Sequence, residues 1–272
     1  MRLAVGQALS TTNINANVAS AVTLVNGAAA SGARLVLLSE LFLNGYDLDK
    51  FLTAPEPLAV DDLRLDDIRN ACSANGVSAL IGAATVADGE PGEMGVLDNS
   101  LLWFGTDGTT KIVYRKSHIW EGERVSFVRG DGGVIVGFDG VTLGLGICYD
   151  AGFPEFTRAY AKAGVDVILF SSAFALGDER SRYHIYHAAR ALESGAFVAV
   201  SNALGKLGES EFFGESAIYD PTGIRLVNAE SKSRIVVADI DPIAVRDTRS
   251  SLTYLNDLLP DYTPRKIDEE LI

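Results

Sequence analysis

The chain has 272 residues, 47% of them hydrophobic, so it can bury a large core without disulfides or metals. Its 23 basic and 36 acidic residues give a net charge of -13, which would repel phosphate backbones and anionic lipids, so we expect neither a nucleic-acid partner nor a membrane partner. Only Cys72 and Cys148 are present, which excludes a disulfide framework, favours a reducing compartment and predicts a cytoplasmic protein. No segment approaches the ~18 uninterrupted apolar residues of a membrane span, and the start of the chain does not read as a signal peptide.

Strands and helices alternate along the sequence, which predicts one continuous α/β domain. In chain order, we predict a strand at 2–8, a helix at 14–31, a strand at 34–38, a helix at 61–74, a strand at 78–83, a loop at 88–92 and a hairpin of strands 99–104 and 110–114. The second half continues with strands at 133–138 and 141–147, a helix at 154–163, a strand at 165–170, a helix at 182–194 and strands at 196–203, 216–219, 223–227 and 234–240. From about residue 242 we predict a tail that packs on the surface or on a partner subunit.

Three ionisable side chains follow separate predicted strands: Glu40, Lys116 and Cys148. Strand ends of an open α/β sheet converge on its ligand site, so these distant positions can meet. A thiol needs a base to attack at neutral pH, and a carboxylate can be that base. A nearby ammonium and the backbone N–H of Tyr149 would stabilise the oxyanion formed at a carbonyl.

Each of these residues has a simpler interpretation when it is taken alone. A cysteine at a strand end is most often a small buried hydrophobe, a lysine is usually a solvated charge, and Glu40 can merely accept a backbone hydrogen bond. Only the joint pattern favours catalysis.

The sequence resembles the nitrilase superfamily of carbon-nitrogen hydrolases over roughly residues 1–240. The matching strings are Ser-Glu-Leu-Phe at 39–42, Tyr-Arg-Lys-Ser-His-Ile at 114–119, and Gly-Ile-Cys-Tyr-Asp at 146–150 followed by Phe-Pro-Glu at 153–155. Secondary matches are Ala-Arg-Ala-Leu-Glu at 189–193, Phe-Gly-Glu-Ser at 213–216 and Asp-Pro-Thr-Gly at 220–223. All of them occur in the order that is typical of the family.

This resemblance implies a four-layer αββα sandwich that often assembles into dimers or larger homo-oligomers. It also implies that Glu40 is the general base, that Lys116 stabilises the tetrahedral intermediate and that Cys148 forms a thioester. A second family glutamate matches Glu123, which would position Lys116 and the substrate nitrogen, and Glu121 is its competitor. No metal and no cofactor are expected.

The residues next to the cysteine favour one substrate class. Tyr149-Asp150 differs from the pair common in nitrilases proper, and Ala151 and Gly152 replace the arginines that hold the carboxylate of N-carbamoyl-D-amino acids in other relatives. Gly152 also replaces an arginine of the common family form, so this chain lacks that side chain. The block from Lys116 to Trp120, together with Glu123-Arg124, is most similar to that of bacterial amidases acting on small carboxamides. A nitrilase or N-carbamoyl amidohydrolase with the same residues is the alternative, and a catalytically silent binding protein is a further one.

Several other side chains have two interpretations. Tyr46, Trp120, Tyr149 and Phe174 are candidates for substrate binding, because aromatic residues near strand ends commonly wall ligand pockets, and ordinary core packing is the alternative for these rings. A metal site built on the three histidines, His118, His184 and His187, is not expected, because no further ligand lies at a recognisable spacing. Arg190 and Glu193 are predicted to form an ion pair within one helix.

Overall fold

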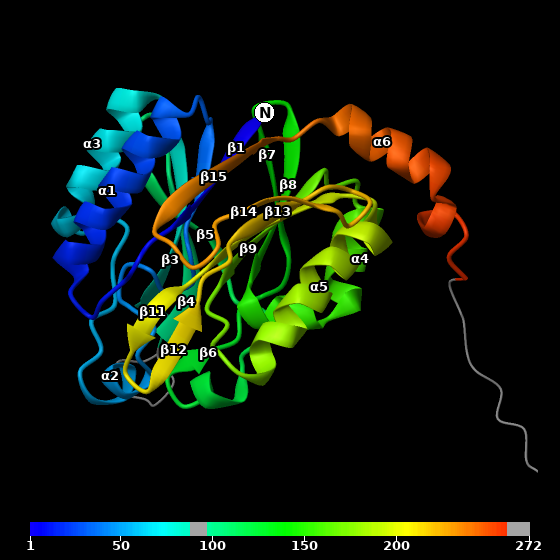
Figure 1. Cartoon of the computed structure of the whole chain (residues 1–272). Coiled ribbons are helices and arrows are strands. Elements are labelled where there is room, and N and C mark those ends of the chain that lie inside the picture. Colours follow the sequence, from blue (N-terminus) through cyan, green and yellow to red (C-terminus); the bar gives the residue numbers. More distant parts are fainter. Residues whose placement is uncertain (88–96, 260–272) are drawn as a thin grey trace, which may run out of the picture.

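The computed structural model of the chain describes residues 1–87 and 97–259, in which two β-sheets lie face to face between two layers of helices (Figure 1). The first sheet has the strand order β15 (Arg234–Asp239), β1 (Arg2–Gln7), β2 (Leu35–Leu37), β3 (Ser78–Val86), β4 (Leu97–Phe104) and β5 (Thr110–Arg115), and β6 (Phe127–Val128) pairs with β4. The second has the order β14 (Arg225–Asn228), β13 (Ala217–Tyr219), β10 (Phe197–Asn202), β9 (Val167–Ser172), β8 (Val141–Ile147) and β7 (Val134–Phe138).

Helices cover the outer face of each sheet (Figure 1). α1 (Ile14–Ala30) and α3 (Asp66–Asn75) lie against the first sheet, and α4 (Pro154–Lys162) and α5 (Asp178–Ser194) lie against the second. Alternation along β1 explains the layers, because Leu3 and Val5 join the core between the sheets whereas Ala4 packs with the helices outside. The αββα architecture expected from the sequence is therefore confirmed.

Strands that are buried on both faces appear in the sequence as continuous apolar runs. This is why the sequence predicted most of these strands well. β9 is fully buried along its length, and it pairs in parallel with β8 and β10. These parallel pairs, like β1, β2 and β3 in the first sheet, align their carboxyl ends at one edge of the molecule. The side chains that follow the strands are thereby brought together.

The structure corrects the sequence prediction in several places. α5 begins at Asp178 and not at residue 182, because Gly177 supplies a turn with a positive φ of 99° and the acidic Asp178 and Glu179 favour a helix start. The predicted helix at 61–74 is divided into the short 3-10 helix η1 (Leu63–Leu65) and α3.

Other elements were not predicted at all. The segment 205–212, for which the sequence analysis predicts no element, is largely the hairpin of β11 (Leu204–Leu207) and β12 (Ser210–Phe213), which turns at Gly208. The predicted tail begins with the helix α6 (Pro242–Ser251) and the 3-10 helix η4 (Thr253–Leu255). The helix α2 (Leu48–Thr53) and the short strand β6 are likewise additions.

The helix α6 is fixed to the second sheet layer. Its residue Val245 is buried, and the Arg249 side chain donates hydrogen bonds to the backbone oxygens of Ser194 and Val165. The predicted loop at 88–92 and the end of the chain from residue 260 lie outside the described residues. Within the described ranges, none of the helices combines the length and apolar character that a membrane span needs.

Candidate active site

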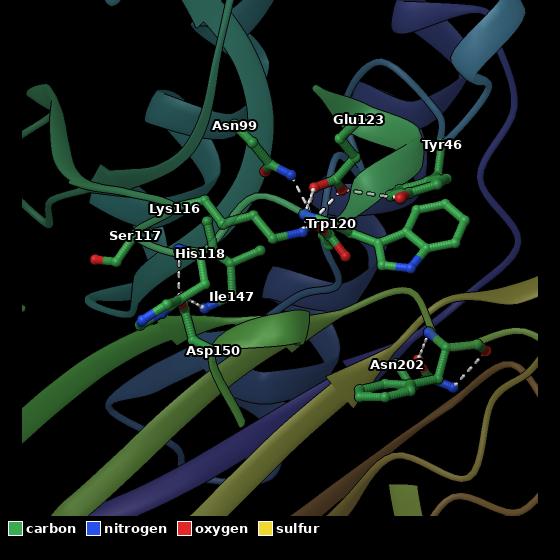
Figure 2. Close-up of polar contacts among 12 residues, drawn as sticks. Tyr46, Asn99, Lys116, Ser117, His118, Trp120, Glu123, Ile147, Asp150 and Asn202 are labelled. Carbon is green, nitrogen blue, oxygen red and sulfur yellow. Dashed lines mark hydrogen bonds and ion pairs between the residues drawn. The ribbon is translucent and has the colours of Figure 1, made fainter. Parts of the chain in front are cut away.

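Glu40, Lys116 and Glu123 form a buried charge cluster at the carboxyl edge of the first sheet. The Lys116 Nζ lies 2.6 Å from Glu40 Oε1, and 2.8 and 2.7 Å from the two carboxylate oxygens of Glu123. All three side chains are completely shielded from solvent. Figure 2 shows Lys116 and Glu123 pointing toward each other. The competitor Glu121 is exposed, so Glu123 is the glutamate that contacts Lys116.

Neighbouring polar groups orient the two carboxylates. Asn99 of β4 donates a 2.7 Å hydrogen bond to Glu40 Oε1, and the Tyr46 hydroxyl donates one of 2.8 Å to Glu123 Oε1 (Figure 2). The backbone N–H of Trp120 donates to Glu123 Oε2 at 3.1 Å. Within the described part of the chain, the buried Glu40 Oε2 has no hydrogen-bond partner, which leaves one carboxylate oxygen free to accept a proton.

Cys148 lies in a sharp turn between β8 and the 3-10 helix η3 (Cys148–Gly152). Its φ is 41°, a left-handed value that is uncommon for a residue with a side chain and is typical of strained functional turns. Nucleophiles in other hydrolases occupy comparable strand-to-helix turns. Because the first N–H groups of a helix lack partners inside the helix, the Tyr149 N–H is placed to bind an oxyanion next to the sulfur.

Burial and neighbouring charge adjust the proton affinities of this cluster. Burial raises the pKa of Glu40 to about 7, although the Lys116 charge opposes the shift. Burial, followed by the Glu40 charge, also raises the pKa of the Cys148 thiol, while Lys116 and a hydrogen bond from the Ala173 N–H oppose this rise. For Lys116, burial would lower the pKa, but the charges of Glu123 and Glu40 outweigh it and raise the pKa above its usual value. The resting thiol is therefore neutral, and a carboxylate titrating near neutral pH lies close to it.

A cavity of about 290 Å³ opens over the cysteine. Lys116 and Cys148 line it, whereas Glu40 and Glu123 are not among its lining residues. The residues singled out from the sequence for substrate binding all contribute to its wall: Tyr46, Trp120, Tyr149 and Phe174. Asn202 fixes Phe174, because its amide side chain bonds both the backbone N–H and the backbone oxygen of that residue at 2.7 and 3.3 Å.

The histidines lie outside this cavity. The His118 Nδ1 lies 2.7 Å from Asp150 Oδ1, and its ring stacks on Phe153 with a centroid separation of 3.8 Å. His184 pairs with Glu215 at 3.0 Å, and burial lowers the pKa of His187 to about 3. Within residues 1–87 and 97–259, no group of three or more His, Cys, Asp or Glu side chains is placed to hold a metal ion.

The predicted ion pair of Arg190 with Glu193 is present at 2.8 Å. Arg190 also donates hydrogen bonds to the backbone oxygens of Ala151 and Gly152 at 2.8 and 3.3 Å. It thus anchors α5 to the turn that carries Cys148, a role that the i, i+3 spacing could not reveal.

The family model for carbon-nitrogen hydrolases matches residues 2–250. The chain belongs to the carbon-nitrogen hydrolase family. It is 29% identical over 263 residues to "Omega-amidase NIT2" of Danio rerio, covering 92% of each chain, and 27% identical over 247 residues to the protein of the same name in Homo sapiens, covering 87% of each. Among solved structures it matches an amidase from Nesterenkonia sp. with a TM-score of 0.79 at 27% identity, over 93% of this chain and 95% of the other. These likenesses place the chain in the nitrilase superfamily and make it a hydrolase, with amide hydrolysis as the general activity that they support.

This carbon-nitrogen hydrolase has further site residues that the sequence did not indicate. The cavity wall also contains residues from α5 and from the β11–β12 hairpin: Glu179, Arg182, Tyr186, Ser210 and Phe212. No motif marks Arg182 and Tyr186, although both lie in the predicted helix at 182–194. Glu179, Ser210 and Phe212 lie in segments for which no element was predicted. Asn99 could have been suspected only from its place in a strand beside the catalytic blocks.

Asp150 holds the turn that carries Cys148 in place. Its buried carboxylate accepts hydrogen bonds from the backbone N–H groups of Ile147 and His118, at 2.8 and 3.0 Å (Figure 2). It also accepts one from the Tyr114 hydroxyl at 2.7 Å. The network joins the loop that follows Lys116 to the turn that carries Cys148. Asp150 is therefore a positioning residue.

Replacing Asp150 by alanine is expected to lower the free energy of unfolding by about 3 kcal/mol, because several buried donors lose their acceptor at once. Urea unfolding followed by circular dichroism measures this difference. Asp131→Ala, at an exposed aspartate, is the matched control and should leave the unfolding midpoint unchanged. An Asp150→Ala variant as stable as the parent would contradict the anchoring role.

Proposed function

We propose that this hydrolase converts a small primary carboxamide and water into a carboxylic acid and ammonia through a thioester on Cys148. The observation that carries the proposal is the buried cluster itself. A neutral thiol, a carboxylate with one free oxygen and a pKa of about 7, and a buried ammonium lie together at a cavity large enough for a small amide. In this proposal Glu40 is the general base, Lys116 and Cys148 are catalytic, and Glu123 positions Lys116.

In the first half-reaction, the Cys148 sulfur bonds to the amide carbon while its proton passes to Glu40 Oε2. Negative charge develops on the carbonyl oxygen, where the Lys116 charge and the Tyr149 N–H stabilise it. The Lys116 ammonium is already bonded to Glu40 and Glu123, so its main contribution is electrostatic. The carbon-nitrogen bond then breaks, Glu40 returns the proton to the leaving nitrogen, and ammonia departs.

In the second half-reaction, water replaces ammonia. Glu40 takes a proton from the water as its oxygen bonds to the thioester carbon. The carbon-sulfur bond then breaks, the acid is released and the sulfur regains its proton from Glu40. The sum is one amide and one water consumed for one acid and one ammonia formed, with no other reactant.

The relatives support the choice of an amide. The protein from Danio rerio is named an omega-amidase, and structures of the Nesterenkonia amidase have been solved with butyramide and with acrylamide added at its active-site cysteine. Nitrile hydrolysis and N-carbamoyl hydrolysis with the same residues are the alternatives. The paired carboxylate-binding arginines are missing at Ala151 and Gly152, which disfavours the carbamoyl amino acids. A silent binding protein would have no need of a buried Glu40 beside Lys116.

The decisive experiment offers the purified protein butyramide, butyronitrile and an N-carbamoyl amino acid and follows ammonia release. We expect release from butyramide, together with a butyryl adduct on Cys148 in mass spectra of samples quenched during turnover. Ammonia from only the nitrile or only the carbamoyl compound would replace the proposal by that alternative. No ammonia from any of the three would favour the binding protein.

We also infer that the chain acts as a single cytoplasmic hydrolase domain that forms a homo-oligomer. The pairing of β1 with β15 joins segments more than 200 residues apart in one sheet, and both cysteines are free. The outer helix α5 presents Ile185 and Leu192 to solvent, 65% and 39% exposed, on one helical face. This apolar face supports association with a second copy.

Ile185→Asp is expected to shift the protein toward the monomer, because it would place a charge in that contact. Light scattering coupled to size-exclusion chromatography measures the mass. Leu63→Asp, at an 80% exposed leucine of η1, is the control and should leave the mass unchanged. A parent protein that is monomeric at micromolar concentration would contradict the oligomer.

A further inference from the structure

A second hollow, with a volume of about 550 Å³, lies beside the cavity over Cys148. His118, Arg124 and Arg129 are among the described residues that line it, and none of those residues is an Asp or a Glu. The chain as a whole has 36 acidic and 23 basic residues, so a hollow that gathers basic side chains and excludes acidic ones departs from its average charge. The local charge therefore favours an anion.

The two arginines of this hollow keep their hydrogen-bond donors for a ligand. Both residues are exposed. Across the described part of the chain, no protein group forms a hydrogen bond or an ion pair with the guanidinium of Arg124 or Arg129. A guanidinium presents a planar set of N–H groups, which binds two oxygens of a phosphate through parallel hydrogen bonds. The pair is thus available to an oxyanion.

The backbone fixes the loop that carries both arginines. The Gly130 N–H donates a 2.8 Å hydrogen bond to the Lys116 oxygen, which closes the segment between them into a loop. A Cβ at Gly130 would come within 2.5 Å of the backbone oxygen of Arg115, so this close approach requires glycine. Inside the loop, β6 pairs with β4. Arg129 is therefore held beside the residues that follow Lys116.

His118 is held in one orientation at the wall of the hollow. Its Nδ1 lies 2.7 Å from the buried Asp150 carboxylate (Figure 2), and its ring stacks on Phe153. Because a carboxylate accepts hydrogen bonds, Nδ1 carries the proton, and Nε2 is the ring nitrogen left for a ligand. No group among the described residues bonds Nε2. This nitrogen can accept a hydrogen bond from a monoprotonated phosphate, or donate one when the ring is protonated.

The rest of the wall is apolar, and this narrows the class of ligand. Ile119, Phe127 and Phe153 line the hollow, and the Tyr149 ring meets Phe153 edge-on with a centroid separation of 5.1 Å. A phosphate ion alone would leave these surfaces in contact with water, whereas an organic phosphate would cover them. Tyr149 also lines the cavity over Cys148, so it forms part of the wall of both spaces.

We propose that this hollow is a binding site for a phosphate monoester that carries an apolar group. Arg124 and Arg129 bind the phosphate oxygens, His118 supplies a further hydrogen bond, and the apolar wall contacts the organic group. The site is distinct from the cavity over Cys148. Its ligand is not the amide, and the proposal does not depend on the reaction that takes place at the thiol.

Isothermal titration calorimetry of the full-length protein with phenyl phosphate tests the site. Benzenesulfonamide, which has a similar shape and no charge near neutral pH, is the control ligand, and inorganic phosphate shows what the apolar group adds. We expect phenyl phosphate to bind at least about 10-fold more tightly than either, since charge-assisted hydrogen bonds and burial of a ring each contribute a factor of this order. Added salt should weaken the binding, because the arginines are exposed.

Arg124→Gln and Arg129→Gln should each weaken the binding of phenyl phosphate about 5- to 10-fold, and the double variant should weaken it at least about 20-fold. Arg246→Gln, at an exposed arginine of α6, is the matched control. It removes the same charge elsewhere on the surface and should bind as the parent does. Because Arg124 and Arg129 are exposed, all variants should keep the parental unfolding midpoint, which circular dichroism measures.

No detectable binding of phenyl phosphate, equal affinity for benzenesulfonamide, or parental affinity in the double variant would overturn the inference. Inorganic phosphate bound as tightly as phenyl phosphate would overturn the assignment to a monoester. Loss of binding in Arg182→Gln, with binding retained in the double variant, would also overturn it, because Arg182 lines the cavity over Cys148 and the anion would then lie there. None of these outcomes bears on the proposed amidase function, since the titration requires no turnover.

Discussion

Cys148→Ala is expected to lower kcat for amide hydrolysis at least about 10⁴-fold, because no other group near the carbonyl can form the covalent intermediate. The neutral amide is then left with the electrostatic site and water alone. Ammonia release at saturating butyramide measures kcat, and mass spectrometry should detect no acyl adduct on the variant protein.

Cys72→Ala is the matched control for this change. Cys72 is buried in α3 on the outer side of the first sheet, and burial raises its pKa to about 12. Its replacement should retain full activity and the acyl adduct. If Cys148→Ala released ammonia at the parental rate, the thioester route would be wrong, whatever the substrate.

Glu40→Gln is expected to lower kcat/KM by about 10³-fold, within the range observed for loss of a general base. The amide is close to the carboxylate in shape and can still accept from Lys116 and Asn99, so the fold should persist. In the parent protein kcat/KM should rise as the pH increases through about 7, because the base must be ionised and burial raises the pKa of Glu40 to about 7. The residual activity of the variant should lack this rise.

The control is Glu121→Gln, at the exposed glutamate of the same loop as Glu123. It should keep both the rate and the pH profile of the parent. A Glu40→Gln variant that retained the step near pH 7 would assign that step to a different group and remove Glu40 from the role of base.

The sequence was most informative where residues are buried on both sides. The apolar runs of β8 and β9 and the helical spacing in α1 predicted their elements closely, since burial selects side chains by position. The blocks that carry the candidate catalytic residues were also recognised from the sequence. Glu40, Lys116 and Cys148 each follow a strand, and residues that follow parallel strands lie at the same edge of the sheet.

The sequence was least informative at the surface segments that complete the cavity. The β11–β12 hairpin was not predicted, and its Gly205 and Gly208 have positive φ within or beside the paired strands. The start of α5 was placed four residues late, at 182 in place of 178, since Asp178 and Glu179 carry no apolar periodicity. Local propensity is weak evidence where tertiary contacts decide the conformation.

The sequence by itself indicated the candidate nucleophile and its candidate partners, because Glu40, Lys116, Glu123 and Cys148 lie in ordered blocks whose chemistry depends on residue type. The tertiary structure decided how they act together. Among the described residues, it left Glu40 Oε2 without a hydrogen-bond partner. It also gave Cys148 its left-handed turn and brought Lys116 and Cys148 to one cavity. The physical reason is that pKa values and substrate selection depend on burial and on distances across the chain, which only packing of the two sheets and their helices establishes.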